Sequence, residues 1–339
     1  MRALFIGGTG TISTAISHLL VESGWDLTLL NRGTHVERLP RGVSLLTGDI
    51  GNEDKISQLL AGQWFDVIVD FIAFVPEQVR RDIRLFQGRC SQYIFISSAS
   101  AYQKPPSSYL ITESTPLANP YWQYSRDKMA CEEILTNAYR ESAFPVTIVR
   151  PSHTYGDWSI PMSIHGKNGP WQTILRMKEG KPVLVIGDGT SLWTVTHSRD
   201  FARGFVGLMG NVHAIGEAVH ITSDEALPWN QIYQCIATAL DVKPNLFHVA
   251  ADALVARDPA QLGPLTGDKC NSVVFDNSKL KRLVPSFQAT IRFDQGIRTT
   301  LSYFAQHPEL QRLDPDWDAF TEQVIFEEST YRQPFKKPV

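Results

Sequence analysis

Residues 3–16 read Ala-Leu-Phe-Ile-Gly-Gly-Thr-Gly-Thr-Ile-Ser-Thr-Ala-Ile, and this stretch decides the fold. A short apolar strand leads into a glycine-rich turn, and apolar residues at helical spacing follow it. Glycines let the backbone approach a pyrophosphate, and the free N–H groups of a helix N-terminus attract its charge. The stretch therefore predicts a dinucleotide-binding turn, although a glycine-rich turn can also merely reverse the chain. The expected contact residues are Gly7, Thr9, Gly10, Thr11 and Ile12.

Apolar runs and helical stretches alternate as far as residue 150. Strands are expected at residues 3–6, 27–30, 43–46, 67–72, 93–96 and 146–149. Their apolar runs are continuous rather than alternating, so both faces of each strand should be covered by helices. This pattern predicts an α/β fold with a doubly wound parallel sheet, in which ligands bind at the carboxyl ends of the strands.

The alternation of apolar runs and helical stretches stops beyond Arg150, where loops rich in Gly, Pro and Trp appear. Helices are expected there at residues 171–178, 199–209, 229–240 and 317–324. We expect residues 1–155 to form the dinucleotide-binding domain, with residues 191–222 returning to it. Residues 156–190 and 223–339 should form a second, smaller α+β domain that binds the substrate, with a C-terminal tail.

Composition excludes several classes of protein. The 339 residues carry a net charge of −3, so nothing draws the chain as a whole to nucleic acid or to an anionic membrane. Its basic clusters, at residues 80–84 and 336–337, are short and typical of solvated charge. Four scattered cysteines lack metal-ligand spacing, and no apolar run reaches transmembrane length. We therefore expect a cytoplasmic protein with a small-molecule substrate and no metal, membrane or nucleic acid as partner; its oligomeric state stays open, a homodimer included.

The segment Asn31-Arg32-Gly33 ends the second expected strand, where an NAD site usually carries an Asp or Glu for the ribose hydroxyls. An arginine there can pair with a 2′-phosphate, and Asn31 does not repel it. This predicts a preference for NADP over NAD, unless Arg32 is simply a solvated loop residue. After the third strand, Asp49 and Ile50 are expected near the adenine, with helix capping as the alternative role for Asp49.

Tyr124 and Lys128 stand four residues apart and share one face of an expected helix. A phenol with a pKa of about 10 is a poor acid or base at neutral pH, and a neighbouring ammonium favours its ionised form. A serine-rich turn at residues 97–100 ends the fifth strand and can hold a substrate oxygen. Tyr and Lys at this spacing also occur by chance, but in this context they predict proton transfer at an alcohol beside a hydride-carrying cofactor.

These residues resemble the extended short-chain dehydrogenase/reductases, the group that includes sugar-nucleotide epimerases and dehydratases. The resemblance covers the chain to about Leu301 and implies a Rossmann-type fold. The matching segments are Phe95–Tyr102, the YxxxK motif Tyr124–Lys128, Arg150–Gly156, Gly187–Thr190 and Arg199–Ala202.

The resemblance implies a role for each matching residue. Tyr124 would transfer the proton, and Ser98, counted back from Tyr102, would hold the substrate oxygen. Lys128 would hydrogen-bond the nicotinamide ribose and lower the pKa of Tyr124. The remaining expected cofactor residues are Phe71, Ile72, Ala73 and Pro151.

The chain departs from the family at positions that meet the substrate. Dehydratases carry an Asp-Glu pair where Ala99 and Ser100 stand, so elimination of water lacks its usual acid and base. Epimerases carry an Asn where His153 stands and a diphosphate-binding Arg where Trp193 stands, so a UDP-sugar would lose a strong contact. Ser100, His153 and Trp193 are therefore the candidate substrate residues.

The sequence thus predicts an NAD(P)-dependent oxidoreductase or epimerase that acts on a hydroxyl or carbonyl of a carbohydrate-like substrate. Three tryptophans, Trp158, Trp171 and Trp193, either form a stacking surface for a ring or fill the core. The rival interpretation is a non-catalytic cofactor-binding or RNA-binding protein on the same fold. The presence of Ser98, Tyr124 and Lys128 and the lack of a basic stripe argue against it.

Overall fold

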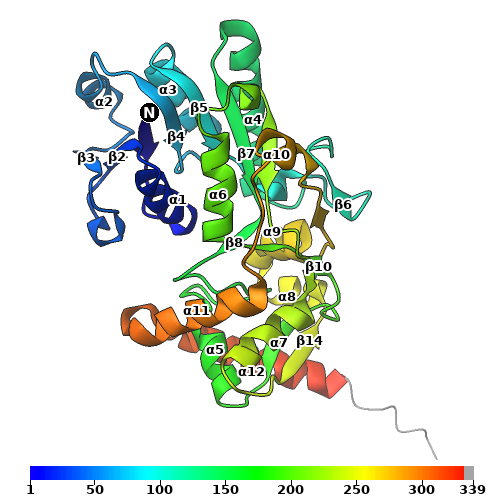
Figure 1. Cartoon of the computed structure of the whole chain (residues 1–339). Coiled ribbons are helices and arrows are strands. Elements are labelled where there is room, and N and C mark those ends of the chain that lie inside the picture. The colour runs from blue at the N-terminus through cyan, green and yellow to red at the C-terminus, as the bar shows by residue number, and fades with distance from the viewer. Residues whose placement is uncertain (332–339) are drawn as a thin grey trace, which may run out of the picture.

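A seven-stranded parallel sheet organises the computed structural model, which describes residues 1–331 (Figure 1). The strand order is β12-β7-β5-β4-β1-β2-β3, and it reverses between β1 and β4, which is where such sheets bind their ligands. The predicted fold class is confirmed. The strands are β1 (Arg2–Ile6), β2 (Asp26–Asn31), β3 (Ser44–Thr47), β4 (Phe65–Asp70), β5 (Cys90–Ile96), β7 (Val146–Pro151) and β12 (Ala218–Ile221).

Helices cover both faces of the sheet, which explains the continuous apolar runs. On β1, Ala3 and Phe5 face the cluster that includes α1 and α6, whereas Leu4 and Ile6 face the opposite cluster under α2, α3 and α4. On β1 neither face meets water, so neither carries polar alternation, whereas most residues of the edge strand β3 are exposed. The five helices are α1 (Thr11–Glu22), α2 (Glu53–Leu59), α3 (Pro76–Phe86), α4 (Gln123–Ser142) and α6 (Ser198–Leu208).

A second part of the molecule, here called the helical part, lies below the sheet in Figure 1. Its elements share one apolar cluster. They are α5 (Trp171–Lys178), α7 (Trp229–Ala239), α8 (Ala251–Arg257), α11 (Phe293–Gln306), α12 (Pro315–Tyr331), β9 (Val183–Ile186) and β14 (Leu246–Val249). Shorter elements link the two parts: β6 (Leu110–Ile111), β8 (His153–Tyr155), β10 (Leu192–Trp193), β11 (Val195–His197), β13 (Leu227–Pro228), β15 (Val274–Phe275), α9 (Leu262–Pro264) and α10 (Ser278–Leu283).

Helix α12 is longer than the predicted residues 317–324. Asp314 accepts a hydrogen bond from the Trp317 backbone N–H at 3.1 Å, and Pro315 occupies the first turn, so the helix begins earlier. Arg176 on α5 forms ion pairs with Asp318 and Glu322 on α12, and these pairs hold α12 against α5. The basic pair at residues 336–337 lies outside the described residues. Nothing between residues 1 and 331 forms a helix that is both long and apolar enough to cross a membrane.

A buried ion pair joins α4 to β7 behind the serine-rich turn. The Arg150 Nη2 lies 2.6 Å from the Glu132 Oε2, and the Glu132 Oε1 also accepts a hydrogen bond from the Ser97 hydroxyl. Arg84 and Glu53 form a pair of the same 2.6 Å length on the surface. The two pairs have the same length but differ in burial, and Arg150 also donates to the Tyr102 hydroxyl at 3.2 Å.

Replacing Arg150 with Met should lower the free energy of unfolding by about 3–5 kcal/mol, because it leaves the Glu132 carboxylate buried without its partner. Arg84→Met removes an exposed pair and should cost about 0–1 kcal/mol. Urea unfolding of both variants and the parent measures the difference. An equal loss in the two variants would contradict this account of the buried pair.

Candidate functional site

The segments expected to bind the cofactor all lie at the carboxyl ends of the parallel strands. Residues 7–12 follow β1, Asn31 and Arg32 lie at the end of β2, residues 49–50 follow β3 and residues 71–73 follow β4. Pro151 ends β7. Because the strands are parallel and the order reverses between β1 and β4, these segments surround the switch point of the sheet.

The turn after β1 needs glycine. Gly7 and Gly8 have φ angles of +98° and +101°, a backbone region that other residues rarely adopt. A Cβ on Gly8 would lie 2.7 Å from the Leu29 Cδ2. Gly10 precedes α1, and its N–H donates to the Ser13 hydroxyl at 2.9 Å. The N-terminus of α1 therefore faces an open edge beside a backbone without side chains, as a pyrophosphate site requires.

Arg32 is exposed and, within the described part of the chain, forms no hydrogen bond or ion pair. Asn31 beside it accepts a hydrogen bond from the Gly33 N–H at 2.8 Å, which shapes the turn. A second arginine, Arg38, was not predicted from the sequence: its Nη1 donates to the Thr9 carbonyl at 3.2 Å, on the glycine-rich turn. No local pattern marks Arg38, because the fold of the loop after β2 brings it there.

Asp49 has a structural use in this geometry. Its Oδ1 accepts a hydrogen bond from the Gly51 N–H at 2.9 Å and closes the turn before α2. Ile50 is buried in the core, whereas Ile72 and Phe74 at the end of β4 are 40% and 45% exposed. Two apolar side chains thus lie open at the switch point, where a flat ring could cover them.

Lys128 on α4 contacts the end of β5 and the loop that follows the neighbouring strand β4. Its Nζ donates to the Ala73 and Ile96 carbonyls, both at 2.7 Å, and lies 4.5 Å from the centre of the Phe74 ring. The side chain is buried. Burial lowers the pKa of Lys128 to about 8.

Tyr124 lies one helical turn before Lys128 and faces Ser98. Burial raises the pKa of Tyr124, and a hydrogen bond with the Ser98 hydroxyl opposes this rise. The Lys128 Nζ is 5.8 Å from the centre of the Tyr124 ring. The expected lowering of the Tyr124 pKa by Lys128 is therefore not seen here, because burial dominates and the ammonium is bonded to two carbonyls.

Ser98 and Tyr124 line one cavity of about 260 Å³ together with the candidate substrate residues Ser100, His153 and Trp193. Lys128, the third expected catalytic residue, is not among the residues that line it. Burial lowers the pKa of His153 to about 3, so its imidazole is neutral at pH 7 and cannot act as an acid there. The Trp193 ring stacks on Trp229 with centroids 5.6 Å apart. The other lining residues are Ala99, Lys104, Trp122, Pro151, Ser152, Asp268, Val273 and Phe275.

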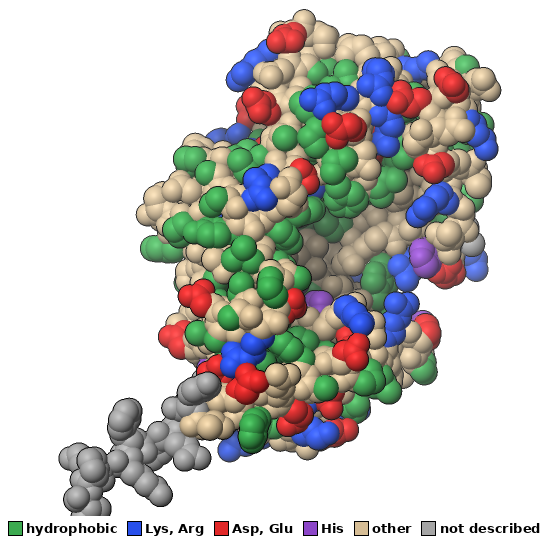
Figure 2. All heavy atoms as spheres, turned by 180° about the vertical axis from the view of Figure 1, so that it is seen from behind, with side chains coloured by type: hydrophobic (Ala, Val, Ile, Leu, Met, Phe, Trp, Pro, Cys, Tyr) green, Lys and Arg blue, Asp and Glu red, His purple; other side chains and the backbone are tan. Residues whose placement is uncertain are grey.

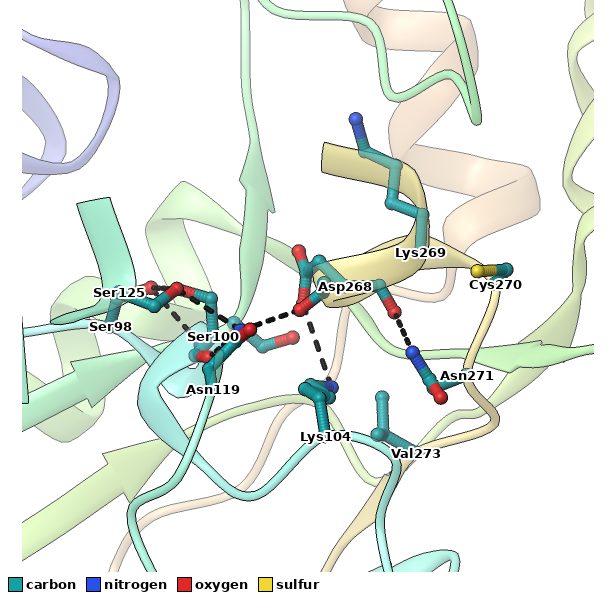
Figure 3. Close-up of polar contacts among 12 residues, drawn as sticks. Ser98, Ser100, Lys104, Asn119, Ser125, Asp268, Lys269, Cys270, Asn271 and Val273 are labelled. Carbon is teal, nitrogen blue, oxygen red and sulfur yellow. Dashed lines mark hydrogen bonds and ion pairs between the residues drawn. The ribbon is translucent and has the colours of Figure 1, made fainter. Parts of the chain in front are cut away.

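A charged pair lines the same cavity and was not predicted from the sequence. The Lys104 Nζ lies 3.7 Å from the Asp268 Oδ1, and only the carboxylate is partly exposed. Figure 3 shows this pair close to the serine hydroxyls, with Lys269 turned away from it. Burial raises the pKa of Asp268 and lowers that of Lys104, despite their mutual attraction. Tertiary packing alone brings these distant segments together, so no spacing rule could find them.

The surface is hollowed between the two parts of the molecule (Figure 2), and a larger cavity of about 1000 Å³ runs along α1 and α6. It shares no lining residue with the smaller cavity. Trp158 lines the larger cavity, Trp193 lines the smaller one, and Trp171 stacks on Phe304. The three tryptophans therefore form no common stacking surface. Within residues 1–331, no cluster of His, Cys, Asp or Glu has the make-up of a metal site.

The low pKa of Lys128 can be measured directly by NMR on protein labelled with ¹³C at the lysine Cε. Lys128 should titrate near pH 8, because burial favours the neutral amine. Exposed lysines should titrate at about 10.4. Burial also lowers the pKa of Lys104 and Lys269, so Lys128→Met assigns the Lys128 resonance by removing it. A Lys128 resonance that titrates above about pH 10 would contradict the described burial of Lys128.

Comparisons with known proteins show which family has this sequence and fold. A model described as the NAD dependent epimerase/dehydratase family matches residues 3–222. The 2'-dehydrokanamycin reductase of Streptomyces kanamyceticus is 26% identical over 85% of this chain and 80% of the relative. The chloroplast stem-loop binding protein of 41 kDa b from Arabidopsis thaliana is 26% identical over 70% of this chain and 63% of the relative.

Among solved structures, a dTDP-glucose 4,6-dehydratase from Bacillus anthracis in complex with NAD superposes with a TM-score of 0.73 at 19% identity. The match covers 91% of this chain and 98% of that one, and it shows a shared fold. The family match spans the glycine-rich turn, the Ser98–Tyr124–Lys128 group and the whole parallel sheet. The chain therefore belongs to the NAD-dependent epimerase/dehydratase family, among the extended short-chain dehydrogenase/reductases.

Proposed function

We propose that this protein is an NAD(P)-dependent oxidoreductase or epimerase that acts on a hydroxyl or carbonyl group of a carbohydrate-like molecule. The observation that carries the proposal is the smaller cavity, where Ser98 and Tyr124 face the same space as three candidate substrate residues. Lys128 contacts the end of β5 and the loop after β4, at the edge where the glycine-rich turn opens. Proton transfer and cofactor binding can therefore occur side by side.

The described residues fit a nicotinamide dinucleotide. Gly7 and Gly8 leave room for a pyrophosphate, Arg32 is unpaired, and Ile72 and Phe74 offer an apolar surface. Residues 7–12 would bind the pyrophosphate, with Asp49 and Ile50 near the adenine and Pro151 beside the nicotinamide. Lys128 would hydrogen-bond the ribose next to residues 71–73. When bound, the nicotinamide supplies or accepts the hydride.

The residues of the chain then handle the proton. Burial keeps Tyr124 protonated at neutral pH, so its phenol is ready to donate to the oxygen of a carbonyl as that group is reduced. In the reverse direction, the phenolate takes the proton of the alcohol. The Ser98 hydroxyl holds the same oxygen, and neutral His153 leaves Tyr124 as the acid. We also propose that residues 1–155 with 191–222 form the cofactor domain, and the remainder the substrate domain.

A carbohydrate-like substrate is supported by the relatives and by the cavity. One relative carries the name of a reductase of a modified aminoglycoside, and the solved structure is named for a sugar nucleotide. Ala99 and Ser100 supply no acid and base for elimination, which favours redox or epimerisation chemistry over dehydration. Trp193 supplies no charge for a diphosphate, while Lys104 and Asp268 offer polar contacts in the cavity.

A second candidate is RNA binding, which the similarity to a stem-loop binding protein favours. The net charge of −3 and the retained Ser98, Tyr124 and Lys128 argue against it. Titration with RNA at several salt concentrations separates the two functions. Tight binding that weakens steeply with salt would favour the RNA-binding function.

Replacing Tyr124 with Phe should lower turnover by about 10²- to 10⁴-fold and leave cofactor binding nearly intact, because only the proton donor is lost. Nucleotide sugars, monosaccharides and aminoglycosides serve as candidate substrates. Nicotinamide absorbance reports net redox, and product NMR reports epimerisation. Tyr121→Phe makes the same change just before α4, outside the cavity, and serves as the control. Turnover of Tyr124→Phe within a few-fold of the control would show that Tyr124 is not the acid.

The cofactor should be NADP(H) rather than NAD(H). A charge-assisted arginine–phosphate contact contributes about 1.5–3 kcal/mol, which corresponds to a preference of roughly tenfold to a hundredfold. Arg32→Ala should remove most of that preference and leave NAD(H) affinity almost unchanged. Arg41→Ala removes another exposed arginine and serves as the control. Isothermal titration decides; equal affinities in the parent, or equal loss of both cofactors in the variant, would refute the role of Arg32.

A further inference from the structure

Asn119 is buried in the loop before α4. It contacts both the serine-rich turn and the segment just before Asp268. Its Nδ2 donates to the Ser100 carbonyl and the Gly267 carbonyl, both at 2.7 Å. Its Oδ1 accepts from the Tyr121 N–H at 3.2 Å. A flipped amide would set its oxygen against two carbonyl oxygens, so the orientation of the amide is fixed.

The same Nδ2 lies 3.3 Å from the Ser125 hydroxyl, but its two protons already point at the two carbonyls, so this longer contact can only share one of them. An amide nitrogen cannot accept a proton from Ser125. The single proton of Ser125 must therefore go elsewhere, and the Ser100 hydroxyl lies 2.8 Å away to accept it. Ser100 in turn lies 2.8 Å from the Ser98 hydroxyl. Figure 3 shows these three hydroxyls in contact.

Ser98 is the end of this chain of hydroxyls. Its oxygen accepts from the Ser100 backbone N–H at 3.1 Å as well as from the Ser100 side chain. Both lone pairs of the Ser98 oxygen are then used, and its own proton is left for Tyr124 or for a substrate oxygen. Each hydrogen bond that points the same way also strengthens the next.

We propose that Asn119 and Ser125 are positioning residues that polarise the hydroxyl chain, so that Ser98 acts as a hydrogen-bond donor toward the oxygen of Tyr124 and of the substrate. The proposal rests on the proposed role of Tyr124. A donor at that place stabilises negative charge on the phenolate or on the substrate oxygen as the proton moves. No covalent bond changes in the chain itself; only the direction of its hydrogen bonds is set.

Charged groups around Tyr124 also act on its pKa, and they stay in place when Ser125 is changed. Asp268 raises this pKa from the opposite wall of the cavity. Lys104 is paired with Asp268, Lys128 is bonded to two carbonyls, and His153 is neutral. A change at Ser125 therefore isolates the hydroxyl chain from the charges.

Removing the Ser125 hydroxyl should raise the pKa of Tyr124. Without the proton from Ser125, the Ser100 oxygen loses its donor, so Ser98 turns its own proton toward that oxygen and away from the phenolate. The test is NMR of cofactor-free protein labelled with ¹³C at the tyrosine Cζ, titrated from about pH 8 to about pH 12. Tyr124→Phe assigns the resonance. Ser125→Ala should raise the midpoint by about half to one pH unit, the value of one ordinary hydrogen bond.

Ser125→Thr keeps the hydroxyl and should leave the Tyr124 midpoint near that of the parent. Ser100→Ala removes the oxygen toward which Ser98 would turn, so its midpoint should rise less than that of Ser125→Ala. Ser125→Cys puts a weak donor in place of the hydroxyl and should raise the midpoint as Ser125→Ala does, which covers the case in which Ser125→Ala does not fold. An unchanged midpoint in Ser125→Ala and Ser125→Cys, or an equal rise in Ser125→Thr, would overturn the proposal. The titration uses neither cofactor nor substrate, so its failure is distinct from a failure of the proposed reaction.

Discussion

The site depends on the ammonium of Lys128. It is buried and bonded to the carbonyl of Ile96, which ends β5, and to that of Ala73 in the loop after β4. Its place on α4 therefore fixes that helix against the switch point. Tyr124, one turn earlier on the same helix, is held over the cavity as a result.

Burial governs the electrostatics of this site. It lowers the pKa of Lys128 and raises that of Tyr124, so each group is pushed toward its neutral form. A simple ion pair between the two is thus not the resting state of the cofactor-free protein. Hydrogen bonds act in addition to burial. Two carbonyls accept hydrogen bonds from the ammonium, and the Ser98 hydroxyl opposes the rise in the Tyr124 pKa.

The sequence predicted the parts of the structure that depend on local pattern. The six strands, the glycine-rich turn and the pairing of Tyr124 with Lys128 follow from periodicity and motif spacing. The choice of Ser98 as their partner came from the resemblance to the extended short-chain dehydrogenase/reductases. Lys104, Asp268 and Arg38 were missed because they reach the site only through tertiary packing. The spacing of Tyr124 and Lys128 led us to expect a lowered pKa for Tyr124. Spacing carries no information about burial, and burial raises this pKa. The predicted range of α12 was too short. Asp314, which accepts a hydrogen bond at the start of the helix, lies outside the apolar periodicity that marks it.

A crystal structure of the protein with NADP⁺ bound tests the central claim most directly. The account predicts the nicotinamide ribose within hydrogen-bonding distance of Lys128 and the nicotinamide ring open to the cavity that Tyr124 and Ser98 line. It also predicts the 2′-phosphate beside Arg32. A nicotinamide ring that does not reach Tyr124, or a 2′-phosphate that lies away from Arg32, would contradict it.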